Sequence, residues 1–161
     1  VLLTGGIGIF GGKYGLTRTS FILKEGLMPL VIGTFLIFLS KFKKRTFDKM
    51  ILNEALFDVE KIKENQNSEN LKKIESLTTR AGYYFVTGFF ISSIIQFILA
   101  SMIVTANPGD SIFNEQVSTM TWVSYIAVLG PTVIIVGKGY LDLINGIEKL
   151  IGLKKEDFLK A

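Results

Sequence analysis

Three long apolar stretches separate the charged residues of this 161-residue chain. No Asp, Glu, Lys or Arg occurs from Ala81 to Gly109, or from Gln116 to Gly137. Each run exceeds the roughly 20 residues that an α-helix needs to cross about 30 Å of hydrocarbon. A third run, Gly26 to Ser40, is shorter, but lysines beyond it can extend their ammonium groups to a membrane surface. The pattern predicts an all-α integral membrane protein.

The helical pattern continues beyond the first of these spans. Leu52, Leu56, Val59 and Ile62 have the spacing of one helix face, and a polar turn follows at 65–68. This predicts a long antiparallel hairpin of two helices, near 26–64 and 69–105, with Pro29 in the first turn. A third spanning helix is expected near 119–152, kinked by Pro131.

The chain divides accordingly into four segments. Residues 25–105 are the predicted spanning hairpin with its cytoplasmic extension, 106–118 an extracytoplasmic loop, and 119–161 a spanning helix with a cytoplasmic tail. Residues 1–24 are rich in glycine and either form a fourth membrane-inserted segment or lie at the membrane interface. Val1 is not the usual initiator, so the sequence leaves open whether residues precede it. Gly8 with Gly12, and Gly11 with Gly15, are four residues apart, a spacing that lets a neighbouring helix approach closely.

The same segment carries a glycine motif, Thr4-Gly5-Gly6-Ile7-Gly8-Ile9-Phe10-Gly11. It resembles the TGxxGxxG nucleotide loop of short-chain dehydrogenases and nucleotide-sugar epimerases, which would imply a parallel sheet and a dinucleotide. The rest of the chain does not supply the strands, the acidic ribose ligand, or a Tyr followed four residues later by Lys. Helix packing is the favoured interpretation of these glycines, and a re-entrant loop is the alternative.

The basic residues are distributed unevenly along the chain. Ten of the 18 Lys and Arg lie in 41–80 and none lies in 105–121. Because positive loops stay in the cytoplasm, 41–80 and the C-terminus are expected to be cytoplasmic, in what we take to be a bacterial inner membrane. Lys41, Lys43, Lys44 and Arg45 form a juxtamembrane cluster suited to anionic lipid.

Few polar side chains lie within the apolar stretches, and we place no acidic residue there. Ser92, Ser93 and Gln96 are candidates for contacts with another helix or another subunit, as are Gly8, Gly12 and Gly15. Leu52, Leu56, Val59 and Ile62 are the predicted cytoplasmic docking stripe.

Cysteine and histidine are both absent from the chain. This removes thiolate and imidazole chemistry and the usual zinc, copper and haem ligands. We therefore expect no enzyme, no catalytic residue, no metal and no cofactor. The net charge of +4 could suggest nucleic acid, but its placement along the chain indicates a membrane, so nucleic acid is not expected as a partner.

The expected function is that of a non-enzymatic subunit of an oligomeric membrane complex, with the cytoplasmic hairpin docking other copies or other protein subunits. One alternative is an ion- or proton-conducting subunit, since the layout of spans and cytoplasmic helices resembles the MotA/TolQ/ExbB stator family. That resemblance implies a proton pathway in which a partner subunit can supply the carboxylate. A further alternative is an immunity or phage-defence protein that works with a soluble partner.

Overall fold

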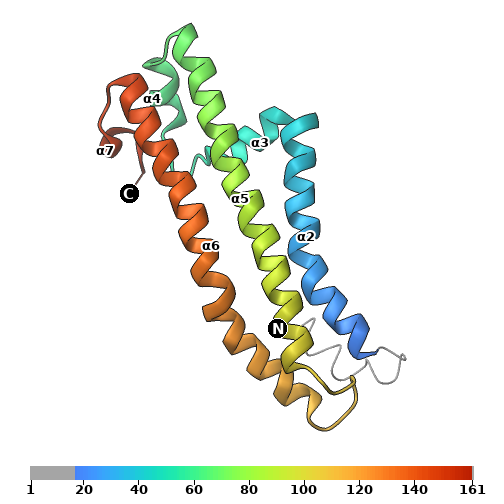
Figure 1. Ribbon diagram of the computed structural model, residues 1–161. Coiled ribbons are helices and arrows are strands. Elements are labelled where there is room, and N and C mark those ends of the chain that lie inside the picture. Colours follow the sequence, from blue (N-terminus) through green and yellow to red (C-terminus); the bar gives the residue numbers. More distant parts are fainter. Residues whose placement is uncertain (1–16, 161) are drawn as a thin grey trace. The chain divides into compact units, whose positions relative to one another are not determined.

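The computed structural model describes residues 17–160, and the regular secondary structure within them is helical, with one isolated β-bridge between Phe57 and Leu159. In this part of the chain six helices follow in order: α2 (Arg18–Phe42), α3 (Lys44–Ile51), α4 (Val59–Glu64), α5 (Ser68–Ile103), α6 (Phe113–Ile151) and α7 (Lys155–Phe158) (Figure 1). Three of them, α2, α5 and α6, are long and apolar enough to cross a membrane. The all-α prediction is thus confirmed for the described residues, and they contain three candidate spans. Most of the possible fourth membrane segment, predicted at 1–24, lies outside the described residues.

Helices α5 and α6 match their predicted ranges closely. Helix α5 runs without a break through Leu77 and Tyr84, as the apolar stripe predicted. Helix α6 begins at Phe113 rather than near 119, because the preceding turn ends earlier than expected. In that turn the backbone N–H of Asn107 donates to Asp110 across 2.7 Å, and Gly109 adopts a positive φ of 101°. Helix α6 also continues through Pro131.

The prediction of one continuous helix over 26–64 is wrong. Helix α2 starts at Arg18 and ends at Phe42, so Pro29 lies well inside it rather than in its first turn. Lys43 is not helical, and residues 52–58 form an irregular link between α3 and α4. Phe57 explains the break: its side chain is buried and stacks on Tyr140 with ring centroids 6.2 Å apart. Burial of this ring holds residues 52–58 in a non-helical conformation, although the apolar residues of this region have the spacing of a helix.

The chain folds as two compact units, and the three long helices each contribute to both. The first unit holds the described residues 17–32 together with 89–133. Its core packs the start of α2 against the end of α5 and the start of α6, through Phe21, Ile22, Ala100, Val104, Ala106, Phe113 and Met120. The rings of Phe21 and Phe113 meet edge to face at 5.3 Å. Polar groups reinforce this core: the Arg18 guanidinium donates to the carbonyl oxygens of Val104 at 2.6 Å and Ser101 at 2.7 Å, at the C-terminal end of α5.

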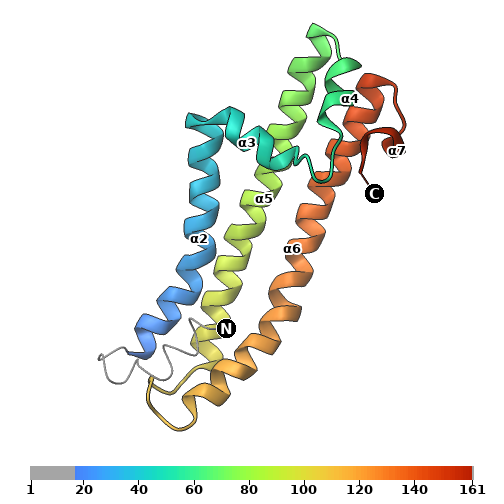
Figure 2. The same cartoon turned by 180° about the vertical axis from the view of Figure 1, so that it is seen from behind.

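The second unit holds residues 33–88 and 134–160 of the described chain, including α3, α4 and α7. Helices α4 and α7 lie side by side in both ribbon views (Figure 2), and Lys61 of α4 donates to the carbonyl of Asp157. The link before α4 pairs with the C-terminal segment, since Asp58 donates its backbone N–H to Phe158 and Lys160 donates to Leu56. Buried side chains from all its helices form the core, among them Phe47, Ile51, Phe57, Ile62, Ile74, Leu143, Ile147 and Phe158. This unit therefore has a hydrophobic core of its own.

Glycines permit three close contacts within the second unit. A Cβ atom at Gly82 of α5 would overlap the Phe47 ring of α3, and one at Gly139 of α6 would lie 2.7 Å from the Cβ of Tyr84. A third glycine, Gly146, faces Leu77 in the same way. Missing side chains thus let α3 and α6 approach α5.

Candidate functional site

Three polar side chains on α5, all predicted to contact other helices, make hydrogen bonds inside the first unit. The hydroxyls of Ser92 and Thr132 lie 2.9 Å apart and link α5 to α6. Ser93 donates to the carbonyl oxygen of Gly26 on α2 across 2.6 Å. Gln96 accepts a 3.1 Å hydrogen bond from the hydroxyl of Ser124 on α6. Helix α5 is thereby tied to both of its neighbours through polar groups on apolar helices.

All of these bonds lie within one chain. Gln96 therefore does not require a second subunit to satisfy its amide oxygen, because Ser124 already provides a partner. The other residues predicted for close helix contact, Gly8, Gly12 and Gly15, lie outside the described residues. Association with other subunits stays a prediction.

Glu25 is a functional candidate that sequence reasoning missed. The expected helix began near residue 26 and left this carboxylate outside, whereas α2 begins at Arg18 and contains it. Oε1 of Glu25 is fully buried and accepts no hydrogen bond from the described residues. The ammonium of Lys24 lies 2.7 Å from this oxygen, so the two charges form an ion pair, but the approach does not have hydrogen-bonding geometry.

A cavity of about 330 Å³ lies beside this carboxylate in the first unit. Its polar wall combines Glu25 and Gln96 with hydroxyl-bearing residues of α6, and its apolar wall comes from α6 alone. The full lining is Glu25, Gln96, Met120, Thr121, Ser124, Tyr125, Val128 and Leu129. The cavity thus places a carboxylate, an amide and hydroxyl groups around one space between candidate membrane spans.

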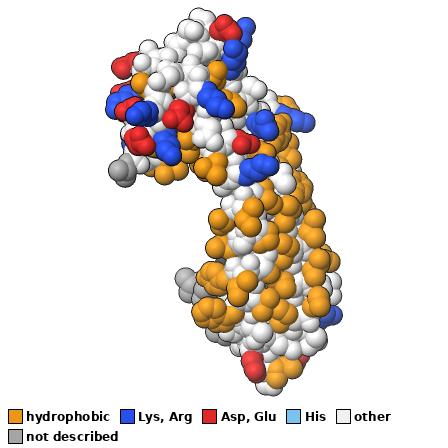
Figure 3. Space-filling view, turned by 60° about the vertical axis from the view of Figure 1, so that its left-hand side comes forward, with side chains coloured by type: hydrophobic (Ala, Val, Ile, Leu, Met, Phe, Trp, Pro, Cys, Tyr) orange, Lys and Arg blue, Asp and Glu red, His pale blue; other side chains and the backbone are white. Residues whose placement is uncertain are grey.

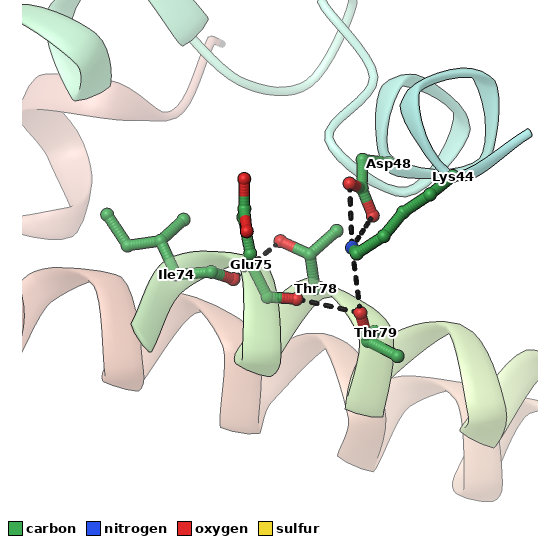
Figure 4. Close-up of polar contacts among 6 residues, drawn as sticks. All are labelled: Lys44, Asp48, Ile74, Glu75, Thr78 and Thr79. Atoms are coloured by element: carbon green, nitrogen blue, oxygen red, sulfur yellow. Dashed lines mark hydrogen bonds and ion pairs between the residues drawn. The ribbon is translucent and has the colours of Figure 1, made fainter. Parts of the chain in front are cut away.

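The predicted lipid-binding cluster is divided by the structure. Lys44 is already engaged: its ammonium bonds both carboxylate oxygens of Asp48, at 3.0 and 2.9 Å, and the hydroxyl of Thr79, at 3.1 Å. Figure 4 shows this contact joining α3 to α5. Lys41, Lys43 and Arg45 are exposed and have no ion-pair partner in the described part of the chain. Three of the four basic side chains remain available to an anionic surface.

The predicted docking stripe does not form a single face. Leu52 and Leu56 lie in the irregular link, while Val59 and Ile62 belong to α4. Ile62 is buried in the core of the second unit, whereas Leu56 is 47% exposed. Leu56 is therefore the most exposed of the four residues, and Met50 and Leu71 are exposed as well.

The surfaces of the two units differ in their content of charged side chains. In Figure 3 most of the Lys, Arg, Asp and Glu side chains in view lie over the second unit, whereas the visible face of the first is mostly hydrophobic and carries only a few charged side chains. Comparisons with protein-family models, curated proteins and solved structures found no match for this chain. The case for a function therefore rests on its own residues.

Proposed function

We propose that this chain is a non-enzymatic polytopic subunit of an oligomeric membrane complex. Helices α2, α5 and α6 cross the bilayer as an antiparallel bundle, and the second unit docks partners on the cytoplasmic side. The observation that carries the proposal is the exposure of α6. Only 6% of the residues in an apolar 18-residue stretch of this helix are buried. A helix of this composition requires a cover of lipid or of another subunit.

The exposed side chains of α6 are large and apolar over its whole apolar length. Trp122 is 73% exposed and Ile126 82%, and Leu129, Val133 and Ile134 are also exposed. Exposure of such side chains to water is unfavourable by about 25 cal/mol per Å², whereas lipid tails solvate them well. A bilayer around α6 removes this cost.

The charge distribution supports the orientation. The basic residues of 41–80 belong to the second unit, which we place in the cytoplasm. Arg18 and Lys24 fall on the opposite side, against the charge rule, but each is held locally. Arg18 binds the C-terminal carbonyls of α5, where a helix favours positive charge, and Lys24 pairs with Glu25.

Two glycines of α6 mark the surface that we assign to a neighbouring subunit. Gly139 and Gly146 contact side chains of α5, whereas a Cβ atom added at Gly130 or Gly137 would meet no atom of the described chain within 4 Å. Gly130 and Gly137 are seven residues apart, which places both of them on one side of α6, together with Ile126 and Ile134. Glycine lowers helix stability by about 1 kcal/mol relative to alanine. A close approach by a helix of a second copy would offset this cost.

A second function, ion conduction, is favoured by Glu25. From the sequence we predicted no carboxylate within a span. In a conducting subunit of that kind, a partner subunit would supply the ion-binding carboxylate. An ionisable side chain on a membrane-crossing helix is commonly part of a pathway or a binding site. The Glu25 cavity thus supports a conducting role within the same complex.

Light scattering of the detergent-purified protein tests the subunit proposal. We expect an oligomer that dissociates when Gly130→Leu and Gly137→Leu are combined, because the added side chains separate the two helices. Val31→Leu is the matched control, since it adds bulk at an exposed apolar position of α2. A strictly monomeric wild-type protein that copurifies with no other protein would refute the proposal.

A further inference from the structure

The cavity beside Glu25 has the composition of a cation site. We propose that it binds a monovalent inorganic cation, Na⁺ or K⁺, that keeps part of its water shell and is held by the Glu25 carboxylate. This deepens the conducting role suggested above and rests on the same carboxylate. It concerns equilibrium binding, which a chain can have without conducting.

The groups around the cavity are oxygen ligands, as alkali cations require. Oε1 of Glu25 is buried without a hydrogen bond from the described residues. The amide oxygen of Gln96 accepts one bond from Ser124, and a carbonyl oxygen has two lone pairs. Thr121 and Ser124 add hydroxyl oxygens to the lining. Hard cations prefer carboxylate, carbonyl and hydroxyl or water oxygens.

The two helices that line the cavity together with α5 each contain a proline close to it. Pro29 of α2 has no N–H to donate to the carbonyl oxygen of Glu25, four residues earlier. Pro131 of α6 likewise has none for Ala127, which adjoins the lining residue Val128. Each proline removes the usual helical donor of a carbonyl oxygen at this level. A carbonyl oxygen freed by a proline in a membrane helix can take another partner, such as a side chain or an ordered water.

The charge and the volume of the cavity select the type of cation. Glu25 is the single carboxylate in the lining, and residues 17–160 hold no cluster of three acidic side chains suited to a divalent metal. A volume of about 330 Å³ equals roughly ten waters at about 30 Å³ each. The space therefore admits an ion together with part of its water shell.

The Lys24 ammonium competes with the proposed cation for the Glu25 carboxylate. Its ammonium lies 2.7 Å from Oε1, where the cation would bind, and 5.3 Å from the centroid of the Phe21 ring. The side chain is 28% exposed, so it can extend to the surface when it leaves Glu25. Removal of this ammonium should therefore tighten cation binding, an effect that a purely structural ion pair does not predict.

The test uses the full chain in detergent and measures the melting temperature by circular dichroism. Sodium or potassium chloride replaces N-methyl-D-glucamine chloride at constant ionic strength. A bound cation stabilises the folded state, so the melting temperature should rise with cation concentration and saturate. Glu115→Gln is the matched control, because Glu115 is exposed at the start of α6.

The variants give distinct expected results. Glu25→Gln should raise the half-saturating concentration at least tenfold, Ser124→Ala should raise it several-fold, and Lys24→Gln should lower it about tenfold. Glu115→Gln should behave like the wild type. If Glu25→Gln does not fold, the opposite shifts of Ser124→Ala and Lys24→Gln decide the question.

Three results would overturn the cation site. They are a wild-type melting temperature that is the same in all three salts, an equal response of Glu25→Gln and wild type, and no tightening in Lys24→Gln. A proton or ion flux assay in liposomes is a separate measurement. Absence of flux with retained binding would remove the conducting role and leave the cation site standing.

Discussion

The hydroxyl of Ser124 on α6 donates a hydrogen bond to the amide oxygen of Gln96 on α5 across 3.1 Å. This bond joins two apolar helices inside one chain, where the sequence alone left open a contact with another helix or with another subunit. Because the Ser124–Gln96 hydrogen bond lies within one chain, a substitution at Gln96 should lower the stability of that chain rather than weaken its association with other subunits.

Gln96→Leu should accordingly lower the stability of the protein by about 0.6–2 kcal/mol, the range for hydrogen bonds between membrane helices. The oligomeric state should not change. Unfolding in mixed micelles of increasing SDS content measures the loss, and Ser124→Ala completes a double-mutant cycle. A coupling energy near zero between the two sites would show that the bond is not formed.

Gly82→Ala should destabilise the docking of α3, because the added methyl group would overlap the Phe47 ring. Overpacking of this kind costs about 1–3 kcal/mol. Ser76→Ala is the control, since Ser76 is an exposed position of the same helix. The control should be neutral or stabilising by up to about 1 kcal/mol. Equal effects of the two changes, measured by SDS unfolding, would contradict this packing.

Phe57→Ala should loosen the second unit. The side chain is buried and stacks on Tyr140, and its loss is expected to cost about 3–5 kcal/mol. The C-terminal segment should then detach, because its backbone pairs with Leu56 and Asp58 on either side of Phe57. Limited trypsin digestion should cleave first at Lys154 or Lys155, and Leu56→Ala should leave the digestion pattern as in the wild type. Unchanged resistance of Phe57→Ala would show that this ring does not hold the segment.

Substitutions of the neighbouring residues Lys44 and Arg45 should have different effects, one on stability and the other on lipid binding. Lys44→Ala removes contacts with Asp48 and Thr79, so it should lower stability. Arg45→Ala leaves an exposed position and should instead reduce the amount of anionic lipid bound in nanodiscs that contain phosphatidylglycerol. Quantification of copurified lipid checks this, and equal lipid loss in both variants would contradict the division of the cluster.

The long apolar runs were sufficient to predict α5 and α6, because helices near 69–105 and 119–152 follow from composition and length alone. The region from Lys43 to Asp58 was not predictable in the same way. Its apolar residues have helical spacing, but the burial of Phe57 against Tyr140 and the pairing with the C-terminal segment depend on contacts distant in sequence. Tertiary packing there overrides local periodicity.

The candidate site was predicted only in part. Ser92, Ser93 and Gln96 stand out as polar residues in an apolar run, but their partners Thr132, Gly26 and Ser124 depend on the pairing of helices. Glu25 was missed because a charged pair at residues 24 and 25, just before an apolar run, resembles a helix boundary. A glutamate four residues before Pro29, on a helix that begins at Arg18, is the signal that would have placed it.

The central claim is that the chain crosses a membrane, with the turn before α5 in the cytoplasm and the loop before α6 outside. The native sequence has no cysteine, so single cysteines at Ser68 and Ser111 can be labelled selectively. Both positions are exposed. In intact cells a membrane-impermeant maleimide should label Ser111→Cys and leave Ser68→Cys unlabelled until the membrane is disrupted. Labelling of both positions in intact cells, or protection of both, would contradict this account.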